Sequence, residues 1–181
     1  YMGKEMAEEA VHLLQMSVGT RLPDLANELE KLAIHVGDGK AIGLEDVREI
    51  VNASKGASIF KLADAMGKRN SEPALSLLKQ LVDQGENPTR MVAMLPRPIV
   101  ILRRARWLQG LRLPRADIAR QLRVPPFFLS GYLEQASLFS DEDLWNAYDS
   151  LLEADNKLKS RSRSSHVYLS ELIVRVCSGF A

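Results

Sequence analysis

Apolar side chains recur every three or four residues along nearly the whole chain, and this spacing constrains the fold more than any other feature. The spacing places these side chains on one face of an α-helix, as Leu25, Leu29, Leu32 and Val36 illustrate. No run of alternating β-branched residues is long enough to predict a pair of strands. The sequence therefore predicts an all-α fold.

Several local signals divide this helical pattern. The first apolar stripe begins at Met6 and continues through Leu14, so a helix is expected from the start of the chain. Residues 52–58 are small, polar and unpatterned, which is typical of a linker. Pro96 and Pro98 fall inside an apolar helical pattern. Each lacks an amide hydrogen, so a kink or a break is expected there.

Near the C-terminal end two more segments are readable. Ser140 is followed three residues later by Asp143, and this spacing predicts a capping box at the start of a long helix. Residues 157–165 are basic and rich in serine, so they are expected to form a loop before the last helix.

Composition and charge exclude several classes of protein. In 181 residues, 46% are hydrophobic and 26% charged, the balance of a chain that folds around a core. The formal net charge of +1 provides no strong attraction to nucleic acid or anionic lipid. Cys177 is the only cysteine, and no apolar run approaches the ~20 residues that span a bilayer. We expect a cytoplasmic protein with no membrane partner, and the helical pattern at Tyr1 suggests that a domain precedes it.

The sequence offers no recognisable catalytic chemistry. His12, His35 and His166 are scattered without the spacing of a metal site, and glycine-rich phosphate loops are lacking. We therefore predict no catalytic residues, no bound cofactor and no metal. The chain is expected not to be an enzyme by itself.

Two basic clusters are candidates for contact with phosphates. One comprises Arg103, Arg104 and Arg106, and the other lies in the expected loop and comprises Lys157, Lys159, Arg161 and Arg163. Such cations bind DNA without reading its sequence, although most charge runs are simply solvated. Non-specific DNA contact is the prediction for these residues.

A sequence-specific DNA-binding protein is the main alternative. Residues 118–129 have the apolar spacing of a helix-turn-helix. Against this reading, Arg123 stands in the turn where glycine is usual, and the second helix offers Phe127 and Phe128 rather than side chains that hydrogen-bond to bases. Two packed helices explain the pattern equally well, with both phenylalanine rings in the core.

Several blocks of sequence resemble the delta subunit of bacterial DNA polymerase III. The resemblance covers most of the chain and rests on the order of these blocks, which are Leu25-Ala-Asn-Glu-Leu-Glu-Lys-Leu32, Leu44-Glu-Asp-Val47, Ile59-Phe-Lys-Leu-Ala-Asp-Ala65, Ala74-Leu-Ser-Leu-Leu78, Ile118-Ala-Arg-Gln-Leu122 and Tyr132-Leu-Glu-Gln-Ala136. Pro96 and Pro98 depart from the family, in which a continuous helix is expected at that place.

The resemblance implies a domain organisation and a set of partners. Residues 1–56 would form an AAA+-like helical lid, and residues 57–181 a helical collar that assembles with the ATPase subunits and delta-prime of the clamp loader. The sliding clamp would be bound only by a domain preceding this sequence. Leu22 stands where ATPase relatives place a lid arginine, which implies a lid that does not serve ATP hydrolysis. The expected role is that of an accessory subunit of the polymerase, which helps to open and load the clamp.

Overall fold

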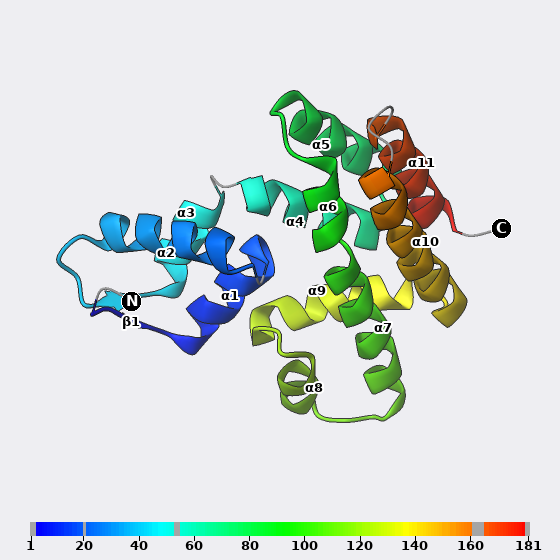
Figure 1. The fold of residues 1–181 in the computed structure, drawn as a ribbon. Coiled ribbons are helices and arrows are strands. Elements are labelled where there is room, and N and C mark those ends of the chain that lie inside the picture. The colour runs from blue at the N-terminus through cyan, green and yellow to red at the C-terminus, as the bar shows by residue number, and fades with distance from the viewer. Residues whose placement is uncertain (1–2, 20, 53–54, 161–164, 180–181) are drawn as a thin grey trace. The chain divides into compact units, whose positions relative to one another are not determined.

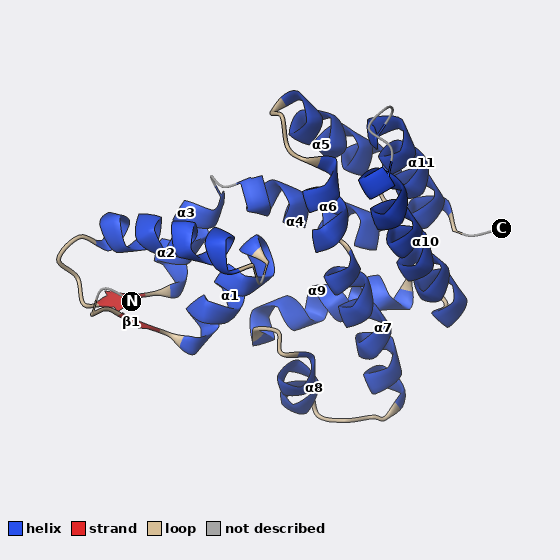
Figure 2. Cartoon of the chain, in the orientation of Figure 1, coloured by secondary structure: helices blue, strands red, loops and turns tan. Residues whose placement is uncertain are grey.

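The computed structural model describes residues 3–19, 21–52, 55–160 and 165–179, and these residues are helical almost throughout (Figures 1 and 2). The helices in chain order are α1 (Glu8–Val18), α2 (Leu22–Val36), α3 (Leu44–Asn52), α4 (Lys55–Gly67), α5 (Ser71–Asp83), α6 (Pro88–Met94), α7 (Pro96–Gly110), α8 (Arg115–Leu122), α9 (Pro126–Ser137), α10 (Asp141–Ser160) and α11 (Ser165–Ser178). Two very short strands, β1 (Glu5–Met6) and β2 (Ala41–Ile42), are the exception. The predicted all-α class is confirmed.

The chain divides into two compact units, Tyr1–Phe60 and Lys61–Ala181. The division lies inside α4, which begins at Lys55. The predicted linker, residues 52–58, is wrong for Asn52, which ends α3, and for residues 55–58, which are helical, while residues 53 and 54 lie outside the described part of the chain. Small polar residues read as a linker because they lack an apolar pattern, yet alanine, lysine and serine all tolerate a helix when it continues into a packed stripe.

The first unit consists of α1, α2 and α3 packed on one another. Their shared core is apolar and includes Ala10, Leu13, Leu14, Val18, Leu32, Val47 and Val51. The sequence placed Met6 in the first helix, and this was wrong because Met6 lies in β1. There it pairs in parallel with Ile42 of β2, and buried Ile42 holds the strand pair against the helices.

The second unit is built around α7 and α10. α7 packs on α8, α9 and α10, while α10 also packs on α6 and α11, and α5 packs on α11. The largest fully buried side chains of this unit include Leu62, Met66, Leu81, Met91, Leu95, Leu102, Leu108, Phe139, Leu144 and Leu151. A packed core of this kind fixes the orientation of α7 and α10, which form the candidate site.

The predicted interruption at the prolines is confirmed. α6 ends at Met94 and α7 begins at Pro96, with Leu95 between them. Pro96 and Pro98 both lie in the first turn of α7, where amide groups have no acceptor within the helix. The prolines therefore begin a new helix without losing a hydrogen bond.

The predicted capping box at α10 is also confirmed. The Asp143 amide donates to Ser140 Oγ at 2.9 Å, and the Ser140 amide donates to Asp143 Oδ2 at 3.0 Å. Asp143 has a second role, since its carboxylate binds Arg69 at 2.6 Å. The predicted loop at residues 157–165 was wrong in part, because α10 continues to Ser160 and α11 begins at Ser165.

Candidate interaction site

Metal-binding groups and membrane-spanning helices are not found among the described residues. Within them, no group of His, Cys, Asp and Glu side chains is arranged to hold a metal ion. None of the described helices combines the length and the apolar character needed to cross a membrane. Leu22, at the start of α2, is 80% exposed, and its side chain carries no group that could hydrogen-bond to a phosphate.

The helix-turn-helix shape suggested by the sequence is present. α8 and α9 pack together, and Arg123 joins them with a φ of 54°, a left-handed conformation that glycine adopts at less cost. The second helix nevertheless exposes no Arg, Asn or Gln side chain, the types that most often read bases. Its only amide side chain, Gln135, is buried and donates to Asp64, and Ser130 accepts a hydrogen bond from Arg115.

The two phenylalanines of α9 do not both lie in the core. Phe127 has 42% of its surface exposed and Phe128 is half-buried, so the expectation that both are core residues was wrong. Their ring centroids lie 4.4 Å apart, which lets each ring cover the other. Adjacent residues on a helix point in directions about 100° apart, so only Phe128 turns toward the packed side.

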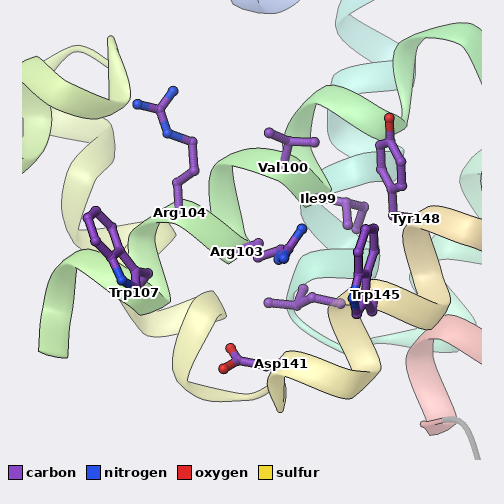
Figure 3. A pocket seen from close by; sticks show the side chains of 9 residues that line it. Ile99, Val100, Arg103, Arg104, Trp107, Asp141, Trp145 and Tyr148 are labelled. Atoms are coloured by element: carbon purple, nitrogen blue, oxygen red, sulfur yellow. The ribbon is translucent and has the colours of Figure 1, made fainter.

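The second unit has a groove between α7 and α10 (Figure 3). It has a volume of about 640 Å³ and is lined by Ile99, Val100, Arg103, Arg104, Trp107, Asp141, Leu144, Trp145 and Tyr148. Ile99 and Leu144 are buried and form its floor. The groove is thus mostly apolar and aromatic, with two arginines on the α7 side.

Both tryptophans of the chain line this groove. Trp107 is 64% exposed and Trp145 is 53% exposed, although these are among the most costly side chains to leave in water. The Arg103 guanidinium lies over the Trp145 ring at 4.3 Å from its centroid, and Figure 3 shows the two side chains pointing toward each other. Exposed tryptophans and arginines beside a half-buried tyrosine in one concave place are typical of a binding surface.

The three arginines predicted as phosphate contacts have different surroundings. Arg103 stacks on Trp145, Arg104 donates to the backbone oxygen of Gln121 at 3.0 Å, and Arg106 pairs with Asp141 at 3.0 Å. The structure brings Arg103 and Arg104 to the groove, while Arg106 is directed to an ion pair at its end. Phosphate contact by these residues stays a prediction.

The second basic cluster is described only in part. Lys157 pairs with Glu153 at 2.6 Å and lies over the Tyr168 ring at 5.0 Å. Its hydrogen bonds with Glu153 and Tyr168 raise the pKa of Lys157, and the same bond to Lys157 lowers the pKa of Glu153. The side chain of Lys159, and Arg161 and Arg163 altogether, lie outside the described residues.

Sequence reasoning missed the aromatic half of the groove. Trp145 and Tyr148 are three residues apart, and Trp107 follows Arg103 by four, so each pair shares one face of its helix. The position of Trp107 and Trp145 at the edge of an apolar stripe was the sequence signal that could have indicated a binding surface. That the two faces meet depends on the packing of α7 against α10, which no local pattern specifies.

Comparison with known proteins supplies the family context. The family described as "DNA polymerase III delta subunit, C-terminal domain" matches residues 56–176. DNA polymerase III subunit delta of Bacillus subtilis (strain 168) is 25% identical over 173 residues, which cover 96% of this chain and 50% of that protein. The probable DNA polymerase III subunit delta of Aquifex aeolicus (strain VF5) is 26% identical over 94 residues, which cover 51% of this chain and 27% of that protein.

A solved structure shares the fold. The Bacillus subtilis DNA clamp loader delta protein (YqeN) matches with a TM-score of 0.62 and 25% identity, over 98% of this chain and 52% of that one. The chain thus spans about half the length of the Bacillus subtilis relative. Because the matched family covers residues 56–176, well over half of the sequence, the chain belongs to the DNA polymerase III delta subunit family, in its C-terminal domain.

Proposed function

We propose that this chain is the lid and collar part of a clamp-loader delta subunit, which contributes to opening and loading the sliding clamp in DNA replication. The observation that carries the proposal is the family match over residues 56–176, which coincides with most of the second helical unit. In this proposal residues 1–56 are the AAA+-like lid and residues 57–181 are the collar.

The proposed partners follow from the same assignment. The collar would assemble with the ATPase subunits and delta-prime of the loader. The exposed aromatic groove of the second unit supports this role, since such surfaces are covered in assemblies. Contact with the sliding clamp would be made by the half of the delta subunit that this sequence does not match.

The proposal makes the chain an accessory, non-catalytic part of the polymerase machinery, located in the cytoplasm. Exposed, apolar Leu22 supports a lid that does not take part in ATP hydrolysis. Weak DNA contact without sequence preference is retained for the basic segment at residues 157–163. A sequence-specific regulator is disfavoured, because α9 presents no exposed Arg, Asn or Gln for base readout.

Size-exclusion chromatography tests the proposal. Mixed with the ATPase and delta-prime subunits of the same loader, the chain should co-elute in one complex. Mixed with the sliding clamp alone, it should elute separately. Binding to the clamp with no binding to the loader subunits would contradict both the domain assignment and the proposed role. A DNA selection experiment that returned a strong consensus site would favour the regulator instead.

A further inference from the structure

We propose that the groove between α7 and α10 docks an acidic amphipathic helix of another protein subunit. This inference rests on the proposed function, because it names the kind of surface that the collar would recognise in a loader neighbour. It depends on three features of the described residues, namely the apolar stripes, the charge of α7 and the acidic border of α10.

The apolar stripes run along both helices beside the groove. On α7, Val100 and Trp107 are exposed seven residues apart, and the exposed Leu111 follows four residues later as the C-cap of the helix, so the three lie on one face. On α10, Trp145 and Leu152 are exposed seven residues apart. Two packed helices with such faces leave a trough between them, into which the apolar ridge of a third helix fits.

The charge of the α7 side favours an acidic partner. α7 contains four arginines and no acidic residue, in a chain whose net charge is only +1. Arg104 and Arg106 already have oxygen partners, whereas the Arg103 guanidinium lies over the Trp145 ring and has no hydrogen-bond or ion-pair partner among the described residues. A guanidinium at an apolar groove binds a carboxylate through paired hydrogen bonds. A glutamate or aspartate beside the apolar ridge of the partner would supply it.

The α10 side argues against nucleic acid as the occupant. It contributes Asp141 to the lining, and Glu142 and Asp149 are exposed on the same helix. A phosphate backbone along the groove would be repelled by these carboxylates. One face of the Trp145 ring is also covered by Arg103, which leaves less surface for base stacking. A partner helix can place its acidic side chains against α7 alone, whereas a nucleic-acid strand carries phosphates along its whole length.

Intrinsic tryptophan fluorescence tests the proposal, because both tryptophans of the chain line the groove. The chain is titrated with two synthetic helices of about 15 residues, the length of α7, that share one leucine pattern. One carries glutamate at its polar positions and the other lysine. A thymidine oligonucleotide is the third probe. The acidic helix should shift the emission to shorter wavelength and saturate, and it should bind at least ~10-fold tighter than the other two.

Substitutions locate the binding. Arg103→Glu and Trp107→Ala should each weaken the acidic helix by ~10-fold or more, as expected for residues at the centre of a contact. Arg120→Glu makes the same charge change at a residue of α8 outside the groove, and Leu138→Ala removes an exposed leucine elsewhere. Both controls should bind like the unmodified chain. Circular dichroism of each variant checks that the fold is kept.

The outcomes separate this proposal from the proposed function. Equal response to the two helices, tighter binding of the oligonucleotide, no response to the acidic helix, or no effect of Arg103→Glu and Trp107→Ala would each overturn the docking proposal. Co-elution of the chain with loader subunits is scored separately. If the chain binds the acidic helix but does not co-elute with the loader subunits, only the loader role is contradicted. If it co-elutes with them but does not bind the acidic helix, only the docking site is contradicted.

Discussion

Replacing Arg69 by alanine should strongly destabilise the second unit. Arg69 donates from Nη2 to Asp143 Oδ2 at 2.6 Å and from Nε to the Leu138 oxygen at 2.8 Å, and its guanidinium lies over the Phe139 ring at 4.3 Å. The side chains of Arg69 and Asp143 are only 23% and 19% exposed, so water screens the pair weakly. The residue thereby joins the end of α4 to the turn between α9 and α10.

The expected loss follows from these contacts. A hydrogen bond to a charged group contributes ~1.5–3 kcal/mol, and a cation over an aromatic ring ~0.5–1 kcal/mol. The contributions are not additive, and Asp143 keeps its bond from the Ser140 amide after the change. We therefore expect Arg69→Ala to lower the free energy of unfolding by about 3 kcal/mol. Because Arg69 has a φ of 55°, Arg69→Gly should recover ~1 kcal/mol of that loss.

Urea unfolding followed by tryptophan fluorescence measures this loss, because both tryptophans lie in the second unit. With a slope of ~2 kcal/mol/M, the midpoint should fall by ~1.5 M. Arg120→Ala is the matched control, since it removes an exposed ion pair with Asp117 that contributes ~0–1 kcal/mol. The reasoning is refuted if Arg69→Ala costs no more than Arg120→Ala. It is also refuted if Arg69→Ala and Asp143→Ala prove additive in a double-mutant cycle.

Three further predictions concern separate features. A Cβ at Gly67 would collide with the buried Gln135, whose side chain donates to Asp64 at 2.7 Å. Gly67→Ala should therefore lower the free energy of unfolding in urea by ~1–2 kcal/mol. In a Gln135→Ala background, where the clash is gone, the same change should be neutral or stabilising. Burial raises the pKa of the Cys177 thiol from 9.0 to about 11, so a thiol reagent at neutral pH should label it only after unfolding. Because the folded-state pKa is the higher one, the stabilising contribution of the protonated thiol is complete below pH 9 and is lost as the pH rises toward 11. Calorimetry should detect no ATP binding in the micromolar range. A stoichiometric binding curve would refute the interpretation that Leu22 and the missing phosphate loop leave the chain without an ATP site.

Features specified by neighbouring residues could be predicted from the sequence. The break at Pro96 follows from one missing amide hydrogen, and the capping box of Ser140 and Asp143 needs only a three-residue spacing. The helix-turn-helix shape was also readable from its apolar spacing. In these places the local chemistry and the final fold agree, so no knowledge of distant contacts was needed.

Features that depend on distant contacts could not be predicted in this way. Met6 continues a helical stripe in the sequence, but Ile42 supplies a strand partner that the local pattern does not reveal. Arg103 was recognised as a cation, whereas its position over the Trp145 ring depends on how α7 packs against α10. The sequence thus identified the charged half of the groove and left out the aromatic half.

Competition with an intact delta subunit tests the central claim most directly. The complete clamp loader is assembled with its full-length delta subunit, and this chain is added in increasing excess while clamp loading onto primed DNA is measured. If the chain occupies the place of delta through its collar without contacting the clamp, it should displace full-length delta from the complex, and loading should fall in proportion. Undiminished loading at saturating excess, with full-length delta still bound, would contradict the account.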